Sequence, residues 1–284
     1  MHFSDRLFQV VQKKKSPLCV GLDPHWDLIP DHLKVGKTET EAIEQFFTEI
    51  LEETAEYAAC VKPNTAFFEV WGSKGWEVLE RISEKAQSLG LLVIADAKRN
   101  DIGTTAAAYA EAFLGAGKPY DALTVTPYLG QDGILPFLEV AVQNEKGIFV
   151  LVKTSNQSSG EFQDLPVGDA LLHEEVARAM ARIGMESVGS SELSDLGAVV
   201  GATYPEDITH LRREMPQQIF LIPGYGSQGG SAEDVRSAFY EGGKGAIINS
   251  SRGILFAGQG KDFAKKAGEA AKKSQEELWA VASS

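Results

Sequence analysis

The chain has 284 residues, of which 43% are hydrophobic and 24% charged, and its formal net charge is −13 at pH 7. This composition is typical of a globular protein and argues against a disordered chain. The negative charge disfavours nucleic acid or an anionic membrane surface as a partner, so an anionic ligand would need a local basic or backbone-amide site.

Apolar runs alternate with amphipathic segments along the chain, which predicts buried strands between helices. Strands are expected at 18–23, 59–63, 91–95, 121–125, 147–152, 197–201, 218–222 and 245–249. Helices are expected at 4–14, 39–57, 76–88, 133–142, 169–182, 205–214, 232–240 and 261–281. A further, alanine-rich helix ends at Phe113, and Thr104 or Thr105 is predicted to cap it. Residues 154–168 are too rich in Ser, Gly and Gln to form a core element.

The eight predicted strands are continuous apolar runs, as strands that are buried on both faces of a parallel sheet require. Eight β/α units in about 250 residues are typical of a (β/α)8 barrel. A doubly wound open sheet is the alternative, but no G-x-G-x-x-G motif opens the first βα turn. The sequence therefore predicts an α/β fold, a single (β/α)8 TIM-barrel domain over residues 1–284 with a parallel eight-stranded core.

The two cysteines, Cys19 and Cys60, lie in apolar runs without the spacing of a metal or redox motif. They are expected to be buried, reduced thiols of a cytoplasmic protein. The N-terminus has no apolar signal core, and no run approaches the roughly 18 apolar residues of a membrane span. We therefore expect a cytoplasmic protein without a membrane partner.

Charged residues gather where the predicted strands end, which is where barrel enzymes carry their active sites. Asp23 ends the first strand, and Asp96 and Lys98 lie two apart on the third, so they share a face. Lys62, on the neighbouring second strand, can reach Asp96, and Asp101 follows in the loop. A lysine ammonium between two carboxylates is stabilised as a cation, because opposite charges a few ångströms apart favour ionisation. The alternative is a surface ion-pair cluster worth about 0–1 kcal/mol per pair, but the strand-end position of Lys62 favours an active site.

The loops after the last two strands are candidates for a phosphate site, a common location in barrels. Glycines such as Gly226 and Gly229 let backbone N–H groups approach an anion. Gln228 can donate from its amide, and Ser251 and Arg252 follow the eighth strand, where a guanidinium can bind phosphate oxygens bidentately. A flexible surface loop would explain the glycines alone, but Arg252 beside them favours phosphate.

In their order and spacing, these segments resemble orotidine 5′-monophosphate decarboxylases, over about residues 16 to 256. The resemblance rests on Gly-Leu-Asp-Pro at 21–24, Val-Lys-Pro-Asn at 61–64, Asp-Ala-Lys-Arg-Asn-Asp at 96–101, Pro-Gly-Tyr-Gly at 223–226, Gln228 and Arg252. Thr-Ser-Asn at 154–156 is similar to the longer bacterial branch of the family. Gln157 departs from the family pattern, where proline is expected, and puts the conformation of that loop in question.

The resemblance implies conversion of orotidine 5′-monophosphate to uridine 5′-monophosphate and carbon dioxide, the last step of de novo pyrimidine synthesis. It implies that no metal or organic cofactor is used and that a homodimer shares its active sites. Lys98 matches the lysine that protonates C6, and Asp96 matches an aspartate that lies near the departing carboxylate. Asp101 matches a residue that reaches the ribose of the partner subunit's substrate.

The remaining matches are substrate-binding positions. Lys62 and Asp23 match ribose contacts, Ser155 matches a contact to the pyrimidine and carboxylate, and Thr105 matches a weaker contact from the second subunit. Gln228 and Arg252 match the phosphate grip.

Two alternatives compete with this interpretation. An aldolase-like or decarboxylating sugar-phosphate enzyme of the same barrel group shares D-x-K-x-x-D but uses magnesium, which needs a hard oxygen ligand where this chain has the cation Lys62. A phosphate-ligand binding protein without catalysis is disfavoured because all members of a charged array are present, and burying them without a use is costly. The four members of this array are Lys62, Asp96, Lys98 and Asp101.

Overall fold

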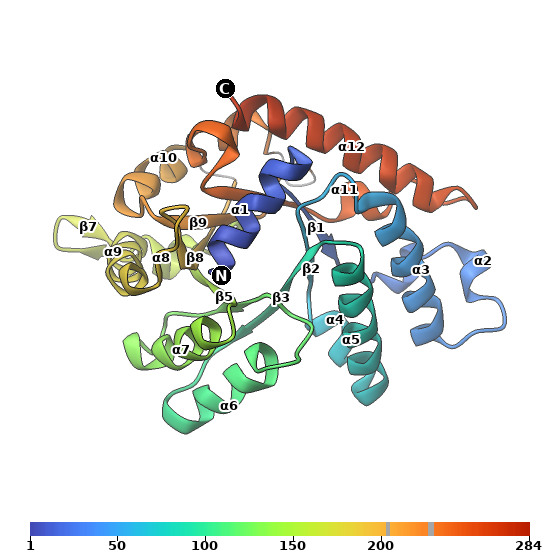
Figure 1. The fold of residues 1–284 in the computed structure, drawn as a ribbon, viewed down its shortest axis with the longest axis horizontal. Coiled ribbons are helices and arrows are strands. Elements are labelled where there is room, and N and C mark those ends of the chain that lie inside the picture. The colour runs from blue at the N-terminus through green and yellow to red at the C-terminus, as the bar shows by residue number, and fades with distance from the viewer. Residues whose placement is uncertain (203–204, 227–229) are drawn as a thin grey trace.

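Eight parallel strands close into a barrel in a computed structural model that describes residues 1–202, 205–226 and 230–284 (Figure 1). The strands neighbour one another in the order β1-β10-β9-β8-β5-β4-β3-β2. Their bounds are β1 Leu18–Leu22, β2 Cys60–Pro63, β3 Leu92–Arg99, β4 Ala122–Val125, β5 Gly147–Lys153, β8 Ser194–Val200, β9 Gln218–Ile222 and β10 Ala246–Ser250. The predicted TIM barrel is confirmed, and each predicted strand overlaps one of these eight.

Helices surround the barrel and connect its strands (Figure 1). The α-helices are α1 Phe3–Lys14, α2 Asp31–Lys34, α3 Glu39–Thr54, α4 Ala66–Glu69, α5 Gly72–Ser88, α6 Gly103–Leu114, α7 Leu135–Gln143, α8 Gly160–Gln163, α9 Leu172–Gly184, α10 Pro205–Glu214, α11 Arg252–Leu255 and α12 Phe263–Ala282. Short 3-10 helices are η1 Trp26–Leu28, η2 Gln131–Gly133, η3 Met185–Ser187, η4 Glu233–Ala238 and η5 Glu241–Gly243. None of the helices in the described ranges combines the length and apolar character that crossing a bilayer requires.

Two local predictions differ from the structure, and a third is confirmed. Thr104 and Thr105 lie inside α6 and do not cap it, because the helix already begins at Gly103, which has a positive φ of 54°. The residue at the N-cap position is Ile102, and no side chain caps the helix there. Residues 154–168 form no core element, as predicted: they contain α8, which has no buried residues, and the exposed strand β6 (Pro166–Val167), which forms a hairpin with β7 (Ala170–Leu171). The predicted helix at 232–240 is the 3-10 helix η4.

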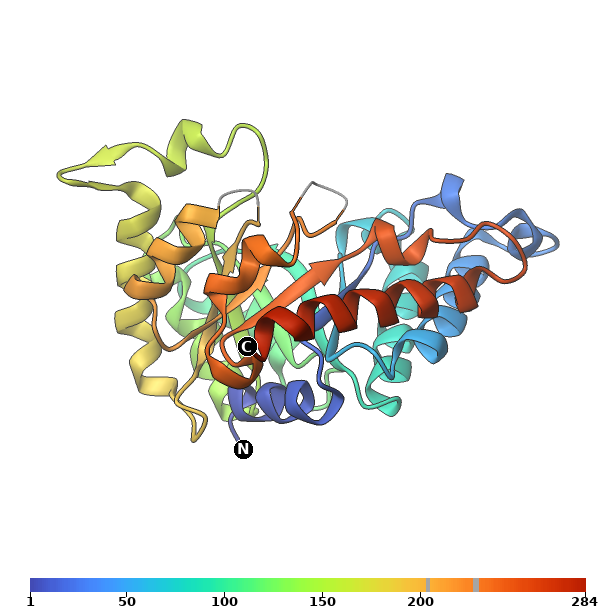
Figure 2. The same ribbon diagram turned by 90° about the horizontal axis from the view of Figure 1, so that it is seen from above.

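Buried apolar side chains form two layers, one between the barrel and its helices and one inside the barrel. The inner layer includes side chains of α1, which covers the amino-terminal end of the strands. Phe3 packs edge-on against Phe149 of β5, with ring centroids 6.1 Å apart. A Cβ on Gly147 would lie 2.3 Å from Phe3, so this approach requires glycine. Figure 2 shows α1 at one end and the yellow-green β6–β7 segment extending at the other.

Two carboxylates tie α1 to the 187–195 segment, to which the sequence assigned no role. This segment comprises the loop before β8 and the first two residues of that strand. Asp195 accepts hydrogen bonds from Ser4 N at 2.9 Å and from His2 Nδ1 at 2.7 Å. Asp5 accepts hydrogen bonds from Ser190 N, Ser190 Oγ and Ser191 N at 3.1, 2.9 and 2.7 Å. Burial acts to raise the pKa of Asp5, but these hydrogen bonds outweigh it and lower the pKa to about 2. This segment therefore anchors the helix that closes the barrel.

Asp5→Asn is expected to lower the free energy of unfolding by about 2 kcal/mol, because three hydrogen bonds to a charged acceptor are weakened or lost. Since the pKa of Asp5 is depressed in the folded state, the advantage of the wild type is full above the unfolded pKa of about 4 and declines as pH falls towards 2. Urea unfolding of both proteins between pH 7 and pH 3 measures this gap. A gap that does not narrow below about pH 4 would contradict the role of the charge.

Candidate active site

Lys62 and Lys98 flank the carboxylate of Asp96 at the carboxyl ends of β2 and β3. Lys62 Nζ donates to Asp96 Oδ2 at 2.5 Å, and Lys98 Nζ donates to Asp96 Oδ1 at 2.5 Å. The side chains of Lys62 and Asp96 are 7% and 9% exposed, whereas that of Lys98 is 47% exposed. The predicted contact between Lys62 and Asp96 is confirmed, and Lys98 is the member of the group that a ligand at the barrel mouth can reach.

Charge keeps this buried group ionised. Burial acts to raise the pKa of Asp96, but the ammonium groups of Lys62 and Lys98 outweigh it and hold that pKa well below its usual range. Burial likewise acts to lower the pKa of Lys62, but the carboxylates of Asp96 and Asp23 outweigh it and raise that pKa above its usual value. Asp96 is therefore an anion, and Lys62 a cation, at neutral pH.

Lys98 reaches Asp96 from an irregular backbone rather than from the regular strand that the sequence suggested. Its φ is 47°, a left-handed conformation that is uncommon for a residue with a side chain. The pairing of β3 with β4 shifts register between Ala95 and Arg99. Asp96 and Lys98 therefore lie in this irregular register shift, which is called the bulge below; such irregularities often lie beside active sites.

Arg99 holds the outer side of this bulge. Its Nη1 donates to the carbonyl oxygen of Ala97 at 3.0 Å, and its Nη2 donates to Glu69 Oε1 of α4 at 2.6 Å. The guanidinium also lies over the ring of Phe113, 5.3 Å from its centroid. These contacts fix the backbone on one side of Lys98.

Thr124 is a residue of this site that the sequence reasoning missed. Its hydroxyl donates to Asp96 Oδ1 at 3.0 Å, and Lys98 N donates to Thr124 Oγ1 at 2.9 Å. A threonine in an apolar strand carries no charge signal, so pattern reading passes over it. Its place near the carboxyl end of β4, next to the strand with Asp96, was the available clue.

Asp101 and Thr105 follow β3 in the chain, and neither contacts Lys62, Asp96 or Lys98 through a hydrogen bond among the described residues. Asp101 Oδ1 accepts a hydrogen bond from Ile102 N at 2.8 Å, and no described residue of this chain places a lysine or arginine nitrogen within salt-bridge distance of it. Thr105, on the first turn of α6, is exposed. Within one chain the predicted four-membered array is therefore three-membered: Lys62, Asp96 and Lys98 meet, and Asp101 stands apart.

Asp23, just after β1, has a buried carboxylate oxygen that accepts no hydrogen bond from the described residues. Its Oδ1 is buried without a hydrogen bond among the described residues, although buried acceptors are normally satisfied. Ser251 packs closely against the backbone of the neighbouring Gly21, where a Cβ would lie 1.9 Å from Ser251 Oγ. This crowding brings the ends of β1 and β10 together, so Asp23 and Ser251 belong to one rim of the barrel.

Ser155 follows β5 in a segment that is held against the strand end. Thr154 N donates to Gln163 Oε1 at 2.9 Å, and Gln163 Nε2 donates to Thr154 Oγ1 at 2.7 Å. A Cβ on Gly201 would lie 3.1 Å from Ser155 Cβ, so the glycine after β8 leaves room for the serine. Ser155 is half-buried at the rim of the barrel mouth.

Gln157 lies in an exposed turn in which Ser159 N donates to the carbonyl oxygen of Asn156 at 3.0 Å. Gln157 is the second residue of this turn, the position that accepts proline but also most other residues. The departure from the expected proline therefore leaves the turn closed.

The predicted phosphate-binding residues lie on the loops after β9 and β10. Gly226 N donates to the carbonyl oxygen of Gly230 at 2.9 Å, and Gly226 has a φ of 74°. Ser251 precedes α11, and Arg252 begins it with an exposed side chain. Gln228 and Gly229 lie outside the described residues. The two loops thus follow adjacent strands, as predicted from the sequence.

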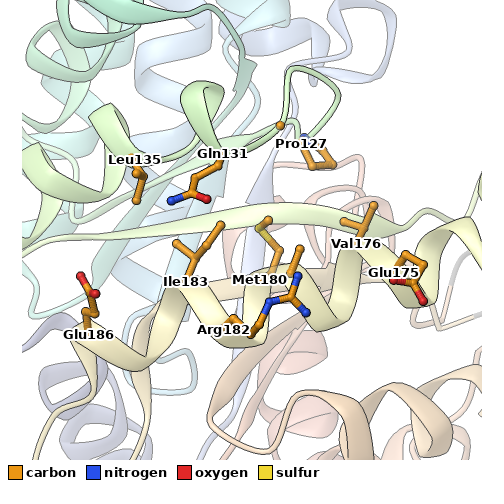
Figure 3. Close-up of a pocket in the computed structure, with 11 residues that line it drawn as sticks. Pro127, Gln131, Leu135, Glu175, Val176, Met180, Arg182, Ile183 and Glu186 are labelled. Atoms are coloured by element: carbon orange, nitrogen blue, oxygen red, sulfur yellow. The ribbon is translucent and has the colours of Figure 1, made fainter.

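A groove of about 560 Å³ lies away from these residues, between η2–α7 and α9 (Figure 3). In Figure 3, Val176, Met180 and Ile183 point from α9 towards Gln131 and Leu135. None of the predicted site residues lines this groove. Its lining carries no paired acid and base of the kind found around Asp96, so the candidate active site remains at the barrel mouth.

The carboxylate of Asp96 is bound by lysine side chains, an arrangement that does not suit magnesium. Both of its carboxylate oxygens accept hydrogen bonds from ammonium groups, whereas magnesium requires an octahedral set of oxygen ligands. In the ranges that the structure describes, no group of three or more His, Cys, Asp or Glu side chains is placed to hold a metal ion. This donor set disfavours the magnesium-dependent alternative.

Comparisons with known proteins agree on one family. A family model described as the orotidine 5′-phosphate decarboxylase / HUMPS family matches residues 16–267. An orotidine 5′-phosphate decarboxylase of Rhodopirellula baltica is 44% identical over 281 residues, which cover 95% of this chain and 93% of the relative. The structure of Leishmania donovani OMP decarboxylase is similar with a TM-score of 0.79 and 35% identity, covering 99% of this chain and 98% of that one.

A larger protein contains a similar part. Leishmania donovani UMP synthase is similar with a TM-score of 0.77 and 37% identity, covering 97% of this chain but 57% of that one. The residues matched by the family model, 16–267, include every predicted site residue.

Proposed function

This chain belongs to the orotidine 5′-phosphate decarboxylase family, and on that premise we propose that Lys98 protonates C6 of orotidine 5′-monophosphate as carbon dioxide leaves. The reaction yields uridine 5′-monophosphate and carbon dioxide and belongs to pyrimidine biosynthesis. The observation that carries the proposal is the ammonium of Lys98, held 2.5 Å from the buried carboxylate of Asp96 and open to the barrel mouth.

The chemistry requires a cation at the reacting carbon. When the bond between C6 and the carboxylate breaks, its electron pair stays on C6 in an orbital that the ring cannot delocalise. A preorganised ammonium stabilises this charge as it develops and then transfers a proton to C6, which leaves a neutral amine that solvent protonates again. Lys62 donates to the other oxygen of Asp96. The carboxylate is therefore held in place by Lys62 while it orients the ammonium of Lys98.

The other predicted residues are proposed to bind the parts of the substrate that do not react. Asp23 and Lys62 contact the ribose, and the unpartnered Oδ1 of Asp23 is an acceptor suited to a sugar hydroxyl. Ser155 contacts the pyrimidine. The phosphate is assigned to the loops after β9 and β10, through Gln228, Arg252, Ser251 and the backbone of Gly226 and Gly229. Binding energy from the phosphate then helps to orient the reacting carboxylate near Asp96.

We also propose that a second copy of this chain covers the rim beside Asp101 and Thr105 and completes the site. Apolar side chains are exposed there after β3 and β4: Ile102 is 54% exposed, Tyr128 90% and Leu129 44%. Leu129 and Asp101 adjoin, since a Cβ on Gly133 would lie 3.1 Å from Leu129 Cβ and 3.4 Å from the carbonyl oxygen of Asp101. Exposed apolar surface next to a carboxylate that has no cationic partner among the described residues of its own chain supports a homodimer with shared sites.

The purified protein is expected to consume orotidine 5′-monophosphate in the presence of a chelator and with no added metal. The reason is that the charges needed at C6 come from lysine side chains rather than from an ion. Loss of substrate absorbance, followed with and without the chelator, measures this. Unchanged absorbance in both reactions would contradict the proposed function, whereas turnover that stops with the chelator would contradict its metal-free mechanism.

A further inference from the structure

Thr124 closes a ring of hydrogen bonds that joins the backbone of Lys98 to its own ammonium. Lys98 N donates to Thr124 Oγ1 at 2.9 Å, Thr124 Oγ1 donates to Asp96 Oδ1 at 3.0 Å, and Lys98 Nζ donates to the same oxygen at 2.5 Å. Thr124 is 1% exposed. We propose that Thr124 is a positioning residue for the decarboxylation, one that sets the backbone and ammonium of Lys98 through its hydroxyl; this inference rests on the proposed function.

The need for such a residue follows from the bulge. Ala95 pairs with Leu123 and Arg99 pairs with Val125, so four steps along β3 face two steps along β4, with Thr124 opposite the excess. In a regular parallel ladder a carbonyl oxygen accepts each strand N–H. At Lys98, the side chain of Thr124 takes that place, and without it a partly buried N–H would lose its partner.

A hydroxyl is suited to this position because it accepts and donates at once. It accepts from the left-handed backbone of Lys98, where φ is 47°, and it donates to the carboxylate that directs the ammonium. Valine has nearly the same shape but can do neither. Removing the hydroxyl therefore eliminates the hydrogen bond to the Lys98 backbone and the hydrogen bond to Asp96, while Lys62 still holds Asp96 in place.

The test compares Thr124→Val with Thr124→Ser, and with Thr54→Val as a matched control. Thr54 is also fully buried, and its hydroxyl donates to the carbonyl oxygen of Ile50 at 2.8 Å, but it lies in α3, away from the site. We expect Thr124→Val to lose about 100-fold in kcat, the scale of a misplaced catalytic group, with KM and the Kd for uridine 5′-monophosphate within about threefold of wild type. Thr124→Ser should recover kcat to within about fivefold, and Thr54→Val should keep it.

The outcome that overturns the proposal is a Thr124→Val enzyme whose kcat stays within about threefold of wild type, or one whose kcat and product affinity fall by the same factor. If valine prevents folding, Thr124→Ala removes the hydroxyl without adding bulk, and the same criteria apply to it. Wild type is assayed first, so an inactive wild type signals failure of the proposed function and not of the role of Thr124.

Discussion

Replacing Lys98 by alanine is expected to reduce turnover of orotidine 5′-monophosphate by about 10⁴-fold or more, because a positioned proton donor and a cation aimed at the reacting carbon are lost together. No substitute stands at the same place, since the side chain of Lys62 is 7% exposed against 47% for Lys98 and is engaged with the far oxygen of Asp96. Loss of substrate absorbance at saturating substrate measures the effect.

The same variant should still bind uridine 5′-monophosphate, because the phosphate site is assigned to loops after β9 and β10 rather than to β3. Lys266→Ala is a matched control: Lys266 is 45% exposed and pairs with Glu269 at 2.9 Å, but it lies on α12. This control should keep wild-type turnover. Substantial decarboxylation by Lys98→Ala would remove Lys98 from the central role, and loss of product binding would indicate a collapsed site.

The barrel was predictable because its strands are buried on both faces. A run such as 147–152 is apolar at every position, which two-sided burial requires and a half-exposed strand does not allow. The position of Lys62 beside Asp96 followed in turn, since sequential β/α units place β2 next to β3 and align their carboxyl ends.

The details around Lys98 were not predictable from local pattern. A regular strand and a bulge can both place Asp96 and Lys98 on one side, so the correct contact was reached through the wrong backbone. The bulge depends on partners that are distant in sequence, Thr124 on β4 and Glu69 on α4. Periodicity in a single segment carries no information about such contacts.

The ends of the barrel show the same limit. The helix α1 was predicted from its apolar face, but its anchoring by Asp5 to Ser190 and Ser191 joins residues about 185 positions apart. The β6–β7 hairpin was missed because two residues per strand give too short an alternation to detect. Both features depend on tertiary contacts rather than on local propensity.

The relation between Lys98 and Asp101 leads to the second large expected effect. Within one chain Lys98 reaches Asp96, whereas Asp101 Oδ1 accepts a hydrogen bond from Ile102 N, and the Asp101 backbone adjoins Leu129 on the exposed rim. If a second copy covers this rim, each active site combines Lys98 of one subunit with Asp101 of the other. Lys98→Ala and Asp101→Ala are then each expected to be inactive as homodimers, since every site lacks one of the two groups.

Mixing the two inactive variants under conditions of subunit exchange is expected to restore activity. In a hybrid dimer, one site receives both substitutions and the other receives neither, so a random equimolar mixture should regain about a quarter of the wild-type sites. If both residues served the site of their own chain, each site of the hybrid would still carry one substitution and stay inactive. Differently tagged variants allow the hybrids to be purified and assayed. Absent recovery in isolated hybrids would contradict the shared site, while leaving the role of Lys98 in its own subunit intact.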